Sequence, residues 1–363
     1  MSVNEAASAS SEGSAASEGS AAKVGSAPSQ ASAPNVRSAG PTPAEEPAPA
    51  GLAHRRVRVE VPATTANLGA GYDALAMALD LVDRFEVEVR SEPGIELSVE
   101  GEGSGPEGIA ADRDNRFVVA FETGLRWALG ELPAGLGWRI AMHNRIPLAR
   151  GLGSSAAATV GGLLAADALC GGNLERRKLL TLSIEIEGHP DNAAAALEGG
   201  FCVTGLVDGR PESVRFDVPR DLRVILFVPD LALPTAGMRA VLPAEVPHRD
   251  AVFNVGRVAL GVAGLAQGRS AALRILTQDR LHEQYRASVY PALPRLVQAA
   301  REAGALGACL SGSGSTVIAF GESVRGLTLV ESAFMAVAAD MGVPGVVHIV
   351  RPRNAGAVVL EAR

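Results

Sequence analysis

The chain contains very little lysine, with Lys23 and Lys178 set against 31 arginines. A phosphate-binding loop of the type that ends in Gly-Lys-Ser/Thr needs a lysine inside it, so this class of nucleotide site is excluded almost everywhere in the chain. Cysteine is also scarce. Cys170, Cys202 and Cys309 are odd in number and far apart, and their spacing indicates neither a disulfide framework nor a metal site.

Long apolar runs are missing as well, since no stretch reaches the roughly 18 residues that a membrane-spanning helix needs. The first residues do not show the basic-then-apolar pattern of a secretory leader. The net charge of −7 gives no general electrostatic reason to bind nucleic acid or an anionic membrane. We therefore expect a cytoplasmic protein with neither partner.

The segment 1–51 has no Leu, Ile, Phe, Tyr or Trp, and 36 of its residues are Ala, Ser, Gly or Pro. Such a composition buries too little apolar surface to offset the entropy of ordering, so it predicts a disordered tail. The remainder is long enough for two domains at about 150 residues each. We place them at 52–212 and 213–363, with the charged, turn-rich segment 207–222 as the junction.

Hydrophobic periodicity predicts strands interleaved with helices. Strands are expected at 57–61, 85–89, 139–142, 224–228, 316–320 and 346–350. Helices are expected at 74–81, 154–169, 174–187, 192–197, 251–265 and 294–303. This mixture favours the α+β or α/β class.

The strongest local signal is a glycine-rich segment directly before a predicted helix. Its glycines permit backbone conformations closed to other residues, and a helix N-terminus is a ready anion site. Its serines can donate to phosphate oxygens or ligate Mg²⁺, although a plain turn with a serine cap remains an alternative. The segment consists of Pro147, Leu148, Ala149, Arg150, Gly151, Leu152, Gly153, Ser154, Ser155, Ala156 and Ala157.

Three further polar turns are candidates for ligand binding. Residues 62–73, P-A-T-T-A-N-L-G-A-G-Y-D, contain Asn67 and Asp73, and residues 310–316 read L-S-G-S-G-S-T. In E-G-H-P-D-N at 187–192, Glu187 could complete a Mg²⁺ shell, because Mg²⁺ takes one or two protein oxygens beside nucleotide phosphates. Taken singly, each segment is also typical of an ordinary turn or helix cap.

In their order and spacing, the segments at 62–73, 147–157 and 310–316 resemble the three motifs of the GHMP kinases, over roughly residues 55–360. The run at 187–192 narrows the resemblance to the homoserine kinase family. The resemblance implies an α+β fold with an N-terminal ATP-binding domain and a ferredoxin-like C-terminal domain. It also implies ATP-dependent phosphorylation of the L-homoserine hydroxyl to O-phospho-L-homoserine, a step of threonine biosynthesis.

The same resemblance implies a role for each matching position. The segment 147–157 would wrap the phosphates of ATP, with Ser155 and Glu187 serving Mg²⁺ and Glu185 as the alternative ligand. Two arginines suit a carboxylate through forked hydrogen bonds, and an aspartate suits the ammonium group. The implied homoserine contacts are Asn67, Asp73, His189, Thr235, Arg239, Arg286 and Gly312.

The predicted site lacks an obvious catalytic base. Mevalonate-type relatives carry an aspartate where Asn192 falls, and an amide cannot accept the hydroxyl proton. A loose phosphoryl-transfer transition state needs positioning and charge neutralisation more than a base. Our hypothesis is direct attack by the substrate hydroxyl, oriented by Asn192, with Asp191 as the rival base.

Other functions stay open at this point. One is a GHMP kinase acting on a mevalonate- or isoprenoid-type alcohol, and another is a non-catalytic ligand-binding protein of the same fold. A nicotinamide-dependent dehydrogenase would rest on Gly151-x-Gly153 alone. The family often forms homodimers, which makes a homodimer a candidate assembly.

Overall fold

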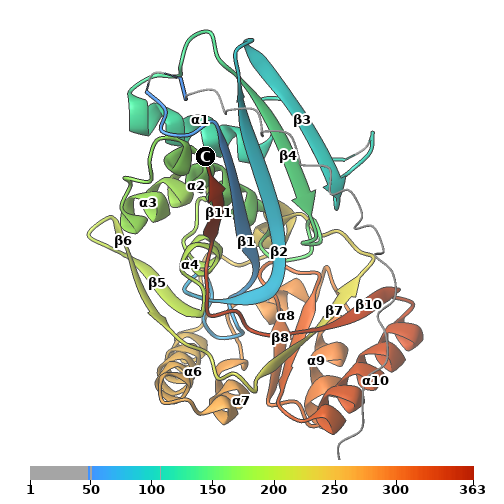
Figure 1. The fold of residues 1–363 in the computed structure, drawn as a ribbon. Helices are drawn as coiled ribbons and strands as arrows, with labels where there is room; N and C mark the ends of the chain where they lie inside the picture. Colours follow the sequence, from blue (N-terminus) through green and yellow to red (C-terminus); the bar gives the residue numbers. More distant parts are fainter. Residues whose placement is uncertain (1–47, 50, 107) are drawn as a thin grey trace, which may run out of the picture. The chain divides into compact units, whose positions relative to one another are not determined.

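The computed structural model describes residues 48–49, 51–106 and 108–363. The predicted tail 1–51 therefore lies almost wholly outside the described residues. These described residues form one compact unit, which contains two β-sheets (Figure 1). No helix in the described ranges is long and apolar enough to cross a membrane.

The first sheet is built around a long hairpin, whose strands pair from Arg56 opposite Glu88 to Ala66 opposite Ala76, with a shift of register between Pro62 and Ala63. Its order is β11 (Val358–Ala362), β1 (Arg56–Ala66), β2 (Leu75–Arg90), β4 (Gly137–Asn144) and β3 (Gly94–Gly101). A second hairpin, β5 (Phe201–Val207) and β6 (Arg210–Phe216), pairs with the first residues of β2. Only the β3–β4 pair is parallel.

The predicted helix at 74–81 is wrong, because β2 already begins at Leu75. Residues 75–79 are all buried; 76–79 pair with β1 along one edge of the strand, and 75–77 pair with β5 along the other. A strand buried on both faces reads as a continuous apolar run, which periodicity alone cannot distinguish from a buried helix. The alternating part of the same strand, 85–89, is confirmed.

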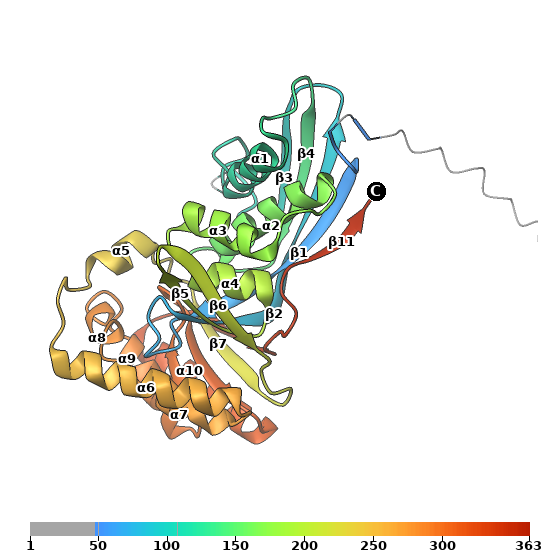
Figure 2. The same ribbon diagram turned by 90° about the vertical axis from the view of Figure 1, so that its left-hand side faces the viewer.

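Four helices cover one face of this sheet (Figure 2). They are α1 (Arg116–Leu129), α2 (Ser154–Leu169), α3 (Arg176–Glu187) and α4 (Asp191–Glu198). Every residue of α2 from Ala156 to Leu169 is buried, because its small side chains let the helix pack closely between α1 and β1. The expected helices at 154–169, 174–187 and 192–197 are confirmed to within two residues.

The second sheet has the order β10 (Gly345–Val350), β7 (Arg223–Pro229), β9 (Val317–Gly321) and β8 (Gly307–Leu310), with all pairs antiparallel. The connections β7 to β8 and β9 to β10 run through α9 (Leu293–Glu302) and α10 (Val324–Met341). This strand order is that of a ferredoxin-like domain, so the expected α+β class is confirmed.

Between β7 and α9 the chain forms helical segments along the side of the unit, with α6 running across the view in Figure 2. They are α5 (Thr235–Ala240), α6 (His248–Ala266), η1 (Ser270–Ala272), α7 (Leu273–Leu276) and α8 (Glu283–Arg286).

The expected domain boundary between residues 212 and 213 falls inside β6. The segment 207–222 is predicted to be a junction because it is charged and rich in turn-forming residues. In the structure, half of it belongs to strands of the first sheet, and most side chains of β6 are exposed. The far end of the chain also returns to the first sheet, where β11 pairs with β1.

Candidate active site

The four polar turns meet in one cavity of about 370 Å³. All seven residues that the resemblance assigns to homoserine line it, together with Glu187, Asp191 and Asn192. From the glycine-rich segment, the lining residues are Ala149, Gly151, Gly153, Ser154, Ser155 and Ala156. Predicted site residues from both halves of the chain therefore lie at one cavity.

The N-terminus of α2 opens into this cavity. Gly153 caps the helix in the left-handed conformation with φ +74°, and no side chain caps α2. A Cβ on Gly153 would lie 2.0 Å from the Thr64 hydroxyl oxygen, so only glycine fits here. The first N–H groups of α2 are thus left to bind an anion.

Two long side chains of the glycine-rich segment turn away from the cavity. The Arg150 guanidinium donates to the carbonyls of Pro229, at 2.8 Å, and Leu148, at 3.1 Å. The Leu152 side chain is buried in the core. These residues shape the loop, and their side chains do not contribute to the cavity lining.

Glu187 lies beside the first turn of α2. Its Oε1 accepts hydrogen bonds from the hydroxyls of Ser155, at 2.9 Å, and Thr159, at 2.6 Å. The alternative Glu185 is exposed and is not among the cavity-lining residues. Ser155 and Glu187 together offer two hard oxygen donors, the kind that Mg²⁺ prefers.

Asp73 and Arg239 form a forked ion pair at the cavity wall. The two Nη atoms of Arg239 donate to Asp73 Oδ2 at 2.8 Å and to Oδ1 at 2.7 Å. Arg239 also donates to the Tyr72 hydroxyl at 2.8 Å. Thr235 lies nearby, with its hydroxyl 3.1 Å from that of Ser313.

Asn67 is buried, and both ends of its amide are engaged within the protein. Its Nδ2 donates to the Gly312 carbonyl at 2.8 Å, and its Oδ1 accepts the Asp73 N–H at 2.9 Å. Asn67 adopts φ 66° and Asp73 φ 55°, backbone conformations uncommon outside glycine. The amide therefore joins the first motif to the third and holds Asp73 in place.

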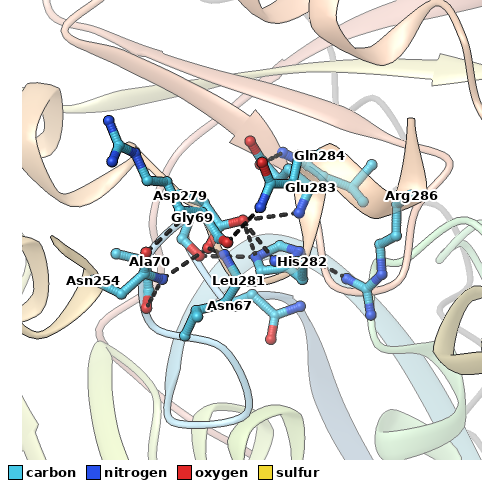
Figure 3. Close-up of polar contacts among 12 residues, drawn as sticks. Asn67, Gly69, Ala70, Asn254, Asp279, Leu281, His282, Glu283, Gln284 and Arg286 are labelled. Carbon is cyan, nitrogen blue, oxygen red and sulfur yellow. Dashed lines mark hydrogen bonds and ion pairs between the residues drawn. The ribbon is translucent and has the colours of Figure 1, made fainter. Parts of the chain in front are cut away.

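Arg286 is 1% exposed, and its guanidinium donates hydrogen bonds to three other residues. Its Nη1 donates to Nδ1 of His282 at 3.0 Å (Figure 3). The same Nη1 donates to the Gly312 carbonyl at 2.9 Å, and Nε donates to the Met238 carbonyl at 3.2 Å. Burial lowers the pKa of this guanidinium.

His189, Asp191 and Asn192 form the remaining wall. Asp191 Oδ1 lies 3.0 Å from His189 Nδ1 and accepts the Asn192 N–H at 2.7 Å. The hydrogen bond to Asp191 raises the pKa of His189 above its ordinary range. Asn192 Oδ1 accepts a hydrogen bond of 2.7 Å from the Thr64 hydroxyl, and this bond fixes the orientation of the amide.

A second cavity of about 380 Å³ adjoins the first. Both are lined by Arg116, Ala149, Ser154 and Ser155, so the glycine-rich turn lies between them. The far walls of the second cavity carry the apolar residues Ile109, Met142, Leu148 and Ala158. Burial raises the pKa of Asp83, in its floor, to about 6.

The sequence reasoning missed Arg116, which begins α1 and extends toward the first turn of α2. Its Nε lies 3.8 Å from Glu187 Oε1, and half of its side chain is exposed. An isolated arginine at a helix start carries no pattern of its own. The only available signal was Asn115, whose side chain caps α1 and fixes where the helix begins.

Family models match both halves of the chain. The GHMP kinase N-terminal domain matches residues 116–200, and the GHMP kinase C-terminal model matches residues 262–328. Homoserine kinase of Carboxydothermus hydrogenoformans is 41% identical over 84% of this chain and 97% of its own length. Homoserine kinase of Moorella thermoacetica is 43% identical, over 83% and 99%.

Solved structures give the same picture. The crystal structure of homoserine kinase from Cytophaga hutchinsonii has a TM-score of 0.75 and 28% identity, and the match covers 84% of this chain and 98% of that one. A mevalonate kinase from L. major has a TM-score of 0.59 at 17% identity, covering 83% and 95%, and shares the fold.

Proposed function

The chain belongs to the homoserine kinase family of the GHMP kinases, and from this premise we propose the following reaction. In the main cavity, the enzyme transfers the γ-phosphoryl group of ATP to the hydroxyl of L-homoserine. The products are O-phospho-L-homoserine and ADP, as in threonine biosynthesis. The observation that carries the proposal is the meeting of an open helix N-terminus with Asp73, Arg239 and Arg286 in one cavity.

We assign the nucleotide to the glycine-rich turn. The phosphate oxygens would accept hydrogen bonds from the N–H groups of the first turn of α2. The nucleoside would extend into the second, more apolar cavity. Arg116 is a cationic side chain that lines both cavities beside that turn, whereas the Arg150 side chain donates to the Pro229 carbonyl instead. Lys178, the one lysine in the described part of the chain, lies over the Trp127 ring.

The donor set beside α2 fits Mg²⁺. Ser155 and Glu187 provide a hydroxyl and a carboxylate within hydrogen-bond distance of each other, and nucleotide phosphates would supply further oxygens. A bound Mg²⁺ neutralises charge on the phosphates during transfer. Thr159 holds the Glu187 carboxylate in position through its own hydrogen bond.

The charges of homoserine match those of Asp73, Arg239 and Arg286 in the cavity lining. Its ammonium suits Asp73, and its carboxylate suits Arg239 and Arg286, with His189, Thr235 and Gly312 at the edge of the same space. Because Asp73 and Arg239 form a forked pair, each can exchange its partner for one end of the zwitterion. Neither charge is then left unpaired, which is the costly outcome in a partly buried site.

The hydroxyl of homoserine would attack the γ-phosphorus while the bond to the bridging oxygen of ADP breaks. We assign Asn192 to orient this hydroxyl, because Thr64 fixes its amide at the cavity wall. The proton then leaves late, to a phosphate oxygen. Asp191 is the rival acceptor, and it already accepts hydrogen bonds from His189 and from the Asn192 backbone.

A coupled ADP-release assay with Mg-ATP and a panel of alcohols tests the proposal. We expect turnover with L-homoserine and little with mevalonate, galactose or 4-hydroxybutyrate, which lacks the ammonium group. Turnover of another alcohol without homoserine would favour a different GHMP kinase. Binding of ATP and homoserine without any ADP release would favour a non-catalytic protein of the same fold.

The Arg239→Met variant provides a matched check on the zwitterion assignment. It should raise KM for homoserine at least tenfold and change KM for ATP less than twofold, since its ion pair is on the amino-acid side. The homodimer and the cytoplasmic location stay predictions.

A further inference from the structure

A polar turn at residues 279–283 lies beside Arg286, outside the four segments that form the cavity. Asp279 anchors this turn by accepting the backbone N–H groups of Leu281, at 3.0 Å, and of His282 and Glu283, at 2.8 Å. Asn254 of α6 donates to the same carboxylate at 2.8 Å. The turn is thus fixed just before α8 starts (Figure 3).

His282 is the centre of the turn and has no exposed surface. Its Nε2 lies 2.8 Å from the Gly69 carbonyl in the first motif, and its Nδ1 lies 3.0 Å from Nη1 of Arg286. A carbonyl only accepts and a guanidinium only donates, so Nε2 carries the hydrogen and Nδ1 offers a lone pair. Both neighbours therefore require the same neutral tautomer.

The surroundings of His282 agree with a neutral ring. Burial lowers its pKa, and the positive charge of Arg286 acts in the same direction, whereas Asp279 opposes them from 3.8 Å. The Tyr72 ring lies against the imidazole, with the ring centroids 5.3 Å apart, and also under the Arg286 guanidinium at 5.5 Å.

From these contacts we infer that His282 is a positioning residue for the substrate carboxylate. As a neutral imidazole it ties the Arg286 guanidinium to the Gly69 turn, so that this arginine and Asp73 keep a fixed spacing across the cavity. The inference rests on the proposed function, because it takes the carboxylate of homoserine as the group that Arg286 meets.

Two substitutions separate the two bonds of His282. His282→Asn places an amide oxygen near the position of Nδ1 and can still accept from Arg286, but it loses the bond to Gly69. His282→Gln reaches the position of Nε2 and can still donate to Gly69, but it leaves Arg286 without its acceptor. Gln284→Ala, at an exposed position of α8, is the matched control.

We expect His282→Gln to raise KM for homoserine about tenfold, with kcat and KM for ATP within about threefold. His282→Asn should raise it distinctly less, and Gln284→Ala should leave all three constants unchanged. The preference for homoserine over 3-aminopropan-1-ol, which lacks the carboxylate, should fall only in His282→Gln. Equal losses in both His282 variants, or an unchanged preference, would overturn the inference.

The tautomer can be read in the unmodified protein by ¹⁵N NMR of histidine-labelled chain, so the test does not depend on the variants folding. The expected result is a buried ring protonated only at Nε2 near neutral pH. A cationic ring or the opposite tautomer would refute the proposed positioning role. A wild-type chain that shows this tautomer but no homoserine turnover would instead refute the proposed function.

Discussion

The hydroxyl of Thr64 gives direct access to the role assigned to Asn192. Thr64 is fully buried in β1, and its hydroxyl donates to Asn192 Oδ1 at 2.7 Å. Thr64→Val replaces this hydroxyl by a methyl group of similar size. The change therefore removes the hydrogen bond without opening a cavity large enough to disturb the sheet.

The expected effect follows from the value of one hydrogen bond. A bond of this kind contributes about 1 kcal/mol, which corresponds to about fivefold in a rate or equilibrium constant. If Asn192 orients the reacting hydroxyl, the loss falls on the transition state. We expect kcat to drop about fivefold while both KM values change less than twofold.

Thr65→Val is the matched control on the next position of β1. Thr65 is equally buried, and its hydroxyl accepts from Ser311 at 2.9 Å, without contact to Asn192. Both variants should lower the melting temperature by about 2–4 °C. Only Thr64→Val should lower kcat in the coupled assay at saturating ATP and homoserine.

The outcome that would refute this reasoning is an unchanged kcat in Thr64→Val, measured beside the expected loss of stability. The orientation of the Asn192 amide would then be irrelevant to the chemical step. An equal loss of kcat in both variants would also count against it, because the effect would then come from the strand rather than from the amide.

Three further outcomes follow from the same site. Glu187→Gln should raise the Mg²⁺ concentration for half-maximal rate at least about tenfold, whereas the exposed Glu185→Gln should shift it less than twofold, as a Mg²⁺ titration will show. Arg116→Met should raise KM for ATP about tenfold and leave KM for homoserine unchanged. Arg113 is an exposed arginine just before α1, and Arg113→Met should change neither constant. Because the pKa of His189 is raised, its cation is fully present below about pH 6.5 and is lost as the pH rises through the raised value. Stability contributed by that cation and kcat/KM for homoserine should both decline over that range, and His189→Gln should remove this phase from the pH profile.

Much of the fold could be predicted from local sequence pattern. The alternation at 57–61 and 85–89 and the small-residue run at 154–169 gave correct elements, because each faces one predictable environment. The prediction for 74–81 failed because residues 75–79 are all buried, so this part of β2 is an unbroken apolar run that periodicity cannot distinguish from a buried helix. The strand β6 is hard to predict because its side chains are mostly exposed, so its charged, turn-rich sequence resembles that of a junction.

The site shows the same division between backbone and side chain. The family resemblance was sufficient to predict that Asp73, His189, Arg239 and Arg286 belong to one site, and all four line one cavity. It could not show that the Asn67 amide bonds the Gly312 carbonyl and the Asp73 N–H, or that Arg150 turns toward Pro229. Such details depend on which acceptor lies within reach in the folded chain, and that information is not local.

The pairing of β11 with β1 has a consequence for synthesis of the protein. Arg58 and Glu361 are 303 positions apart in the chain, yet they are neighbours across this strand pair. On the ribosome, the first sheet and its helices emerge long before their outer strand does. During that interval β1 presents an open edge that can pair with another nascent chain. Folding yield should therefore depend on chaperone supply and translation speed more than the stability of the finished enzyme suggests.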